Sequence, residues 1–138
     1  EWMKGLLVIL PDGGYVVMRS GWDKEAHQLI LDAGPIGCPH SAGHGHADFL
    51  GIQCSAFGEP FIVDPGTYCY TGDPKWRDHF RSTAPHSTVT IDGLDQAIPA
   101  GPFAWQRRPR AAPPAASAAR STSSAATPPW RAPRLFTT

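Results

Sequence analysis

The sequence predicts an all-β protein: an antiparallel β-sandwich fragment with one short helix on a connection and a disordered C-terminal tail. Three observations predict this class. Short runs of residues alternate between apolar and polar, turn signals separate these runs about every 8–15 residues, and the connections are too short for the crossover helices of a parallel sheet. The 138 residues provide enough chain for one modest domain.

Turn residues mark where the expected strands begin and end. Asp12-Gly13-Gly14 precedes the first strand, Ala33-Gly34-Pro35 ends the second, and Gly58-Glu59 joins the third and fourth in a hairpin. The last strand starts at His86 and stops at Asp92-Gly93. The expected strands are residues 15–20, 27–32, 49–57, 60–64 and 86–92.

One segment has the pattern of a short helix. Asp73 can cap its first turn, and Pro74 suits the first helical position. Trp76 and Phe80 are four residues apart, so they would share one face. We therefore expect a helix over residues 73–81, on a connection between strands.

The composition divides the chain at residue 106. Residues 1–106 form the expected β domain and carry a net charge of about −6, whereas residues 107–138 contain six Arg and no acidic residue. Of these last 32 residues, 29 are Ala, Arg, Pro, Ser or Thr, too few apolar groups to offset the entropy of ordering. We predict a disordered tail with incidental charge rather than a nucleic-acid-binding arm, and hypothesise that it is an out-of-frame translation of GC-rich DNA.

Neither a membrane span nor a disulfide framework is expected. The longest nearly apolar run, residues 6–11, is far too short to cross a bilayer, and the N-terminal residues lack the pattern of a signal peptide. The chain reads as if it starts inside a larger protein. Cys38, Cys54 and Cys69 are odd in number, so we expect buried free thiols, with a Cys54–Cys69 bridge as the alternative.

Two histidines two residues apart, in Gly43-His44-Gly45-His46-Ala47-Asp48, are the most informative candidates for a site. Side chains at positions i and i+2 of an extended backbone point to the same side, so His44 and His46 can face one cavity. Asp64 follows at a strand end before Pro65-Gly66, and His86 begins a strand. Imidazole and carboxylate groups in such a set are common zinc ligands.

Three further side chains are weaker candidates. Tyr68 follows Asp64 closely and could exchange a proton near cations or a metal, although, taken alone, an amphipathic tyrosine packing at a strand end is the favoured explanation. Arg77 and Arg81 are four apart on the expected helix and could bind carboxylate or sulfate groups. Solvated helix charges are the alternative for this pair.

Taken in order, the motifs resemble the heparinase II/III-like family of polysaccharide lyases, including related alginate lyases. The resemblance covers about residues 13–106. No single motif is specific, but the spaced set is. The set comprises Gly14-Tyr15-Val16-Val17-Met18-Arg19-Ser20, Asp32-Ala33-Gly34-Pro35, the Gly43–Asp48 stretch, Val63-Asp64-Pro65-Gly66-Thr67-Tyr68, Trp76-Arg77-Asp78-His79-Phe80-Arg81-Ser82-Thr83 and His86-Ser87-Thr88-Val89-Thr90-Ile91-Asp92-Gly93.

This resemblance implies a function. Family members pair an N-terminal α/α toroid with a C-terminal antiparallel β-sandwich and cleave uronic-acid-containing acidic polysaccharides by β-elimination. It implies that His44 faces the substrate, as neutraliser or proton-transfer group, with help from Tyr68. It implies a structural Zn²⁺ bound by His46, Asp64 and His86. It also implies a heparin-, heparan- or alginate-like substrate and a periplasmic or secreted protein.

The sequence departs from the family pattern in two places. Ser87 stands where the family usually has Asn. The toroid, which supplies other catalytic side chains, has no counterpart in these 138 residues, so we expect little or no lyase activity from this chain alone. Two alternatives remain open: a non-catalytic, metal-stabilised β module that binds acidic glycans, and a truncated product that does not fold stably.

Overall fold

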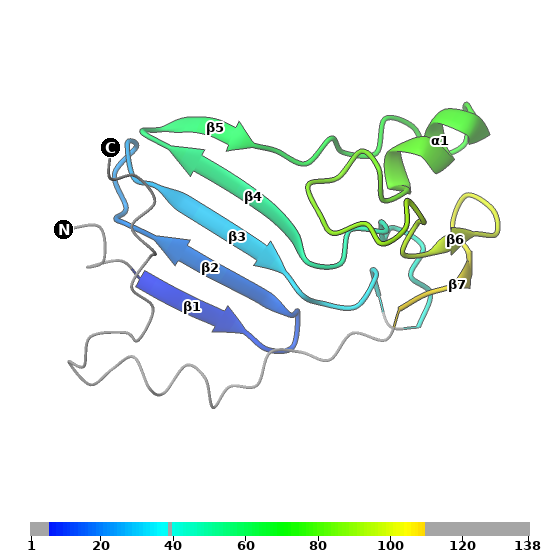
Figure 1. The fold of residues 1–138 in the computed structure, drawn as a ribbon, viewed down its shortest axis with the longest axis horizontal. Helices are drawn as coiled ribbons and strands as arrows, with labels where there is room; N and C mark the ends of the chain where they lie inside the picture. The colour runs from blue at the N-terminus through cyan, green and yellow to red at the C-terminus, as the bar shows by residue number, and fades with distance from the viewer. Residues whose placement is uncertain (1–5, 39, 110–138) are drawn as a thin grey trace, which may run out of the picture.

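An antiparallel sheet dominates the computed structural model, which describes residues 6–38 and 40–109 (Figure 1). Its five strands are neighbours in the order in which they occur along the chain. One helix and a small two-stranded sheet follow. The elements are β1 (Leu6–Leu10), β2 (Tyr15–Arg19), β3 (Gln28–Asp32), β4 (Gly51–Ala56), β5 (Glu59–Ile62), α1 (Pro74–Arg81), β6 (Ile98–Pro99) and β7 (Trp105–Arg107). The predicted antiparallel class with a single short helix is confirmed.

Turn chemistry fixes the register of the sheet. Phe57 and Gly58, between β4 and β5, both have positive φ angles (54° and 80°), as a two-residue hairpin turn that follows the twist of the strands requires. Gly14, after β1, has φ 76°, and a side chain there would collide with the backbone of Gly34. The expected hairpin is therefore confirmed, and the turn after β1 packs directly against the end of β3.

The two faces of the sheet differ in character. The register places residues from β1 to β4 in transverse rows, and paired residues share a face. One face carries apolar side chains only, in the rows Leu7–Met18–Leu29–Cys54 and Ile9–Val16–Leu31–Ile52. The opposite face carries Tyr15, Asp32 and Gln53, and it lies against the loops that form the candidate site.

Helix α1 forms where the capping pattern predicts it. The side chain of Asp73 accepts hydrogen bonds from the backbone N–H groups of Lys75 and Trp76, and Pro74 occupies the first turn. The helix lies beyond the strand ends, next to β6 and β7 (Figure 1). A small core at this end contains Ile36, three alanines and the partly buried Trp105; the alanines are Ala42, Ala47 and Ala97.

Three expectations need correction. Residues 86–92 form turns and bends, with a single bridge between Ile91 and Leu94, because side chains of Thr88 and Gln96 bond to the carbonyl of Phe49 in place of a strand ladder. The apolar run 6–11, which was not among the expected strands, contains strand β1. All three cysteines are free, as preferred, but Cys38 is exposed and the other two are half-buried.

The predicted boundary at residue 106 falls inside a strand, because β7 continues to Arg107. The rest of the predicted disordered tail, residues 110–138, lies outside the described residues. Among the described residues, no helix has the length and apolar character needed to cross a membrane.

Candidate functional site

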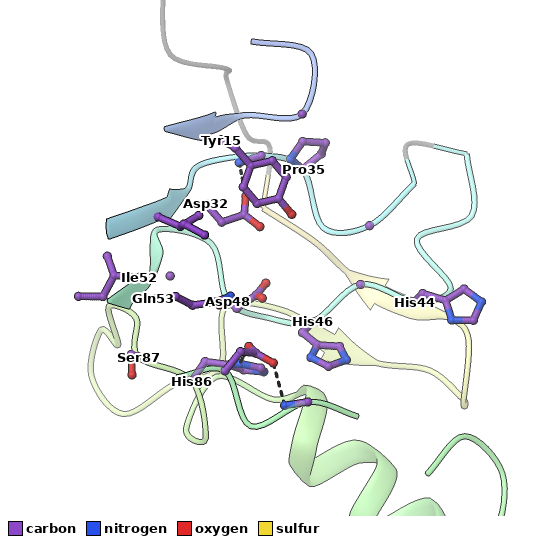
Figure 2. Close-up of a pocket in the computed structure, with 18 of the residues that line it drawn as sticks. Tyr15, Asp32, Pro35, His44, His46, Asp48, Ile52, Gln53, His86 and Ser87 are labelled. Carbon is purple, nitrogen blue, oxygen red and sulfur yellow. Dashed lines mark hydrogen bonds and ion pairs between the residues drawn. The ribbon is translucent and has the colours of Figure 1, made fainter. Parts of the chain in front are cut away.

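A cavity of about 520 Å³ opens between the polar face of the sheet and the segments that follow β1, β3, β5 and α1. Figure 2 shows the side chains that converge on it from these segments. Four carboxylates and three histidines line it, and no Lys or Arg does so among the described residues. These residues are Asp12, Asp32, Asp48, Asp64, His44, His46 and His86.

Four of these groups form a tight cluster. His46, Asp48, Asp64 and His86 each offer one nitrogen or oxygen atom, and the four atoms lie within 4.8 Å of one another. The His46 and His86 rings are 5.1 Å apart, and Nδ1 of His86 lies 2.9 Å from Oδ2 of Asp64. The structure therefore brings together the three predicted metal ligands and adds Asp48.

Burial disfavours the charged forms of both His46 and Asp48. Burial, with the nearby charge of His86, lowers the pKa of His46 to about 4, so its imidazole is neutral at physiological pH. Burial also raises the pKa of Asp48 to about 6, because little water surrounds the carboxylate to stabilise its charge. Neutral imidazole and carboxylate are a donor set that suits Zn²⁺.

An unpaired atom tests whether a metal fits here. Nε2 of His86 is buried and has no hydrogen-bond partner among the described residues, although a buried polar atom normally has one. Its other ring nitrogen, Nδ1, is the one that meets Asp64. A buried imidazole nitrogen without a partner, beside a second imidazole and two carboxylates, fits a divalent cation.

His44 stands apart from the cluster. In Figure 2 its ring points away from His46, Asp48 and His86. Gly45 allows this divergence, because a side chain at that position would come within 2.6 Å of the backbone nitrogen of Gly37. The two histidines line one cavity, as expected, but their rings have different neighbours.

Tyr68 lies outside the cavity lining. Its ring stacks on Phe80 (centroids 5.5 Å apart) and lies 5.9 Å from Trp76, and it is 69% exposed. Its backbone is left-handed, with φ 62°, a conformation that is costly for an aromatic residue and is often found near functional sites. The predicted catalytic role of Tyr68 stays a prediction.

The predicted substrate-binding role of Arg77 and Arg81 does not fit the structure. Their side chains are 1% and 0% exposed, so a soluble polymer cannot reach them. Arg77 donates to the carbonyls of Pro102 and Gly43, and Arg81 to those of Pro102, Gly101 and Ala104. Burial and the charge of Arg81 lower the pKa of Arg77. The helical spacing indicated a shared face correctly, but that face is turned inward.

Several site residues were not predicted. Asp48 belongs to the same stretch as the histidine pair, and its place two residues after His46 was an available signal. Tyr15 and Asp32 come from paired positions on β2 and β3. Burial, with the charge of Asp32 and a hydrogen bond to it, raises the pKa of Tyr15 to about 12, so the phenol keeps its proton. Only the strand register reveals this pair.

Comparison with known proteins gives a consistent picture. The family model described as "Heparinase II/III-like, C-terminal" matches residues 4–138. A heparin-sulfate lyase from Pedobacter heparinus is 36% identical over 92 residues, covering 64% of this chain and 13% of that protein. A heparin-sulfate lyase from Bacteroides stercoris is 31% identical over 88 residues, covering 60% of this chain and 13% of that protein.

Solved structures agree with these matches. The crystal structure of heparan sulfate lyase HepC from Pedobacter heparinus superposes with a TM-score of 0.58 at 34% identity, over 66% of this chain and 14% of that one. A heparinase III structure gives a TM-score of 0.58 at 28% identity over the same shares. The chain thus spans about one seventh of the length of these relatives. By the family model and by these relatives, this chain belongs to the heparinase II/III-like family and matches its C-terminal part.

Proposed function

We propose that this chain forms one wall of the substrate cleft of a polysaccharide lyase that cleaves uronic-acid-containing polysaccharide by β-elimination. Its family and the names of its relatives, which are heparin-sulfate lyases, support this class of reaction. The relatives extend well beyond the matched region. Other parts of a longer protein would therefore complete the cleft, and this chain alone would turn over little or no substrate.

The different surroundings of the two neighbouring histidines carry this proposal. His46 belongs to the four-residue cluster, whereas His44 is exposed at the edge of the same cavity and lies against the rings of Tyr70 and Phe103. A histidine at the surface of a cleft can touch a polymer, and imidazole is a common proton-transfer group in enzymes. We therefore assign His44 to the substrate and His46 to the metal site.

β-Elimination makes definite demands on such a cleft. A base removes the proton at C5 of the uronic acid, the C4–O bond breaks as the C4–C5 double bond forms, and an acid protonates the leaving oxygen. Negative charge builds up on the sugar carboxylate in the transition state, so a cationic or hydrogen-bonding group beside it lowers the barrier. In this proposal the imidazole of His44 takes that position.

We further propose that His46, Asp48, Asp64 and His86 hold a structural Zn²⁺. They tie together the loops after β3 and β5 and the segment that begins at Thr83, and these loops shape the cavity. A bound divalent cation offsets part of the negative charge of the four cavity carboxylates, which otherwise repels an acidic polymer. The four ligand residues would fix the positions of these loops, and His44 would stay at the edge of the cavity.

One paired experiment tests the assignment. Zinc content would be measured by mass spectrometry in the wild-type chain, His46→Ala and His44→Ala. We expect about one zinc per chain in the wild type and His44→Ala, and a large loss in His46→Ala. Equal zinc content in wild type and His46→Ala would overturn the ligand assignment.

Turnover provides the second half of the test. In the longer protein that carries this region, His44→Ala should abolish release of unsaturated uronide from heparan sulfate, followed by ultraviolet absorbance, while zinc stays bound. A variant that retains full turnover would overturn the role of His44. Glycan binding by the longer protein with zinc but without turnover would instead favour a non-catalytic binding module.

The compartment is a separate proposal. A polymeric acidic substrate lies outside the cytoplasm, so we propose a periplasmic or secreted protein. Cell fractionation with an antibody against the chain tests this, and recovery in the cytoplasmic fraction alone would contradict it.

A further inference from the structure

Three aromatic rings from distant parts of the chain meet at the edge of the cavity. The His44 ring lies 5.4 Å from that of Tyr70 and 5.7 Å from that of Phe103. Tyr70 and Phe103 stack at 6.0 Å with only 27° between their planes. Tyr70 is 49% exposed and Phe103 43% exposed. We call these three rings the edge platform: Tyr70 and Phe103 are nearly parallel and about half open to solvent, and the His44 ring stands at an angle to both, 81° to Tyr70 and 54° to Phe103.

A buried cation holds the edge platform together. The guanidinium of Arg77 lies 5.4 Å from the Tyr70 ring centre and 5.9 Å from that of Phe103. It donates hydrogen bonds to the carbonyls of Gly43, just before His44, and Pro102, just before Phe103. One side chain that is 1% exposed therefore fixes all three segments, and the rings are held in place before any ligand arrives.

The chemistry of the platform suits a sugar ring. One face of a pyranose presents C–H groups that pack on an aromatic ring, while the hydroxyl groups at its rim stay hydrated. Half-exposed aromatic rings supply a large contact area at a small cost in side-chain entropy. The platform is uncharged apart from His44, and the cavity beside it is lined by carboxylates, so stacking rather than ion pairing would hold the ligand there.

We propose that Tyr70 and Phe103 form a stacking subsite for the pyranose ring next to the one whose carboxylate faces His44. Arg77 is the positioning residue of this subsite and does not touch the sugar. This inference rests on the proposed function, since it takes the ligand to be a uronic-acid-containing glycan. It adds a contact that does not depend on the charge of the polymer or on the metal.

Oligosaccharide binding to leucine variants tests the subsite. Tyr70→Leu and Phe103→Leu keep an apolar side chain but remove the flat ring, and Phe57→Leu is the matched control, because Phe57 is 72% exposed in the turn between β4 and β5. The probes are a heparan sulfate tetrasaccharide and an unsulfated heparosan tetrasaccharide, titrated into the full 138-residue chain. Aromatic-region NMR spectra report the rings, and calorimetry gives the dissociation constants.

We expect both probes to shift the Tyr70 and Phe103 resonances. Each leucine variant should weaken binding by about three- to tenfold, equally at low and high salt, because stacking is not screened. Phe57→Leu should bind as the wild type does. Unchanged affinity in both platform variants, or a chain that has no ordered aromatic spectrum, would overturn the subsite.

The outcomes separate this inference from the proposed function. Zinc bound at His46 with turnover in the longer protein, but no loss of glycan affinity in the leucine variants, would remove the subsite and leave the function. Ring shifts and weakened variants in a protein that binds no zinc and has no turnover would keep the subsite and remove the lyase assignment.

Discussion

Asp48 is the residue in which burial and charge conflict most clearly. It lies between β3 and β4, lines the cavity and belongs to the four-residue cluster. Burial raises its pKa to about 6, above the ordinary value of 3.8. In the metal-free chain the folded state therefore binds this proton at a higher pH than the unfolded state does. This difference stabilises the folded state at low pH, and the stabilisation is lost as the pH rises toward 6. Metal binding requires the opposite state, the ionised carboxylate.

This conflict predicts how zinc affinity depends on pH. Below about pH 6 the wild-type affinity should fall by up to about tenfold per pH unit from Asp48 alone, because a proton must leave the carboxyl group before the metal binds. His46, with a pKa of about 4, adds little to this slope above pH 5. Zinc titrations from pH 5 to pH 7.5 would measure it.

Asp48→Asn is the informative variant for this measurement. It should bind zinc more weakly at pH 7 and show a shallower slope below pH 6, since the amide does not titrate. Identical slopes in the variant and the wild type would show that Asp48 is not a ligand.

At the scale of the element, α1 has two buried arginines, Arg77 and Arg81, whose hydrogen bonds hold neighbouring loops in place; we call this their scaffold role. Arg81 is 0% exposed, bonds to Asp78 at 3.0 Å, and donates to three carbonyls in the segment between β6 and β7. Its guanidinium also lies 4.5 Å from the ring centre of Trp105. The helix therefore anchors β6 and β7 through a cation rather than through an apolar stripe.

Arg81→Met should destabilise the folded chain strongly. The methionine fills similar space but removes one donor from each of the three carbonyls and the cation that pairs with Asp78, and losing one partner of a buried charged network costs about 3–5 kcal/mol. Lys75→Met is the control, because Lys75 is exposed on the same helix and should change the free energy of unfolding by less than about 0.5 kcal/mol. Urea unfolding followed by tryptophan fluorescence would give both values. Similar values for the two variants would contradict the scaffold role of Arg81.

At the scale of the whole molecule, the sheet has an apolar face that the described residues leave uncovered. None of the eight side chains in its two apolar rows is buried, and Leu7 and Met18 are 40% and 42% exposed. An open apolar face of this kind marks an interface. In the described residues the core lies instead at the other end of the molecule, around Ile36 and Trp105.

We therefore expect the isolated chain to self-associate. Analytical ultracentrifugation at micromolar concentration should show oligomers, and Met18→Glu should shift the chain toward monomer because it places a charge in the middle of the apolar face. Gln53→Glu adds the same charge to the opposite face and should leave association unchanged. Equal association of both variants would show that another surface mediates it.

The local sequence determined most of the sheet and the helix. Alternation and turn residues predicted β2, β3 and the β4–β5 hairpin, and Asp73-Pro74 predicted α1 to within a residue. These signals depend on residues that are neighbours along the chain, so all of them can be recognised in the sequence. The prediction for residues 86–92 was wrong because their alternation is typical of a strand. Hydrogen bonds from the side chains of Thr88 and Gln96 to a carbonyl far away in the chain decide the conformation instead.

The sequence by itself also indicated three of the four residues of the candidate metal cluster, because histidines and an aspartate next to glycine and proline turns are typical of ligands. Tertiary structure alone decided that Asp48 joins them, that the ring of His44 turns away from His46, and that the two helix arginines point inward. The physical reason is desolvation: whether a charged side chain binds a ligand, supports a loop or meets water depends on what covers it. That covering comes from segments such as the one before Phe103, about 60 residues beyond His44 in the sequence.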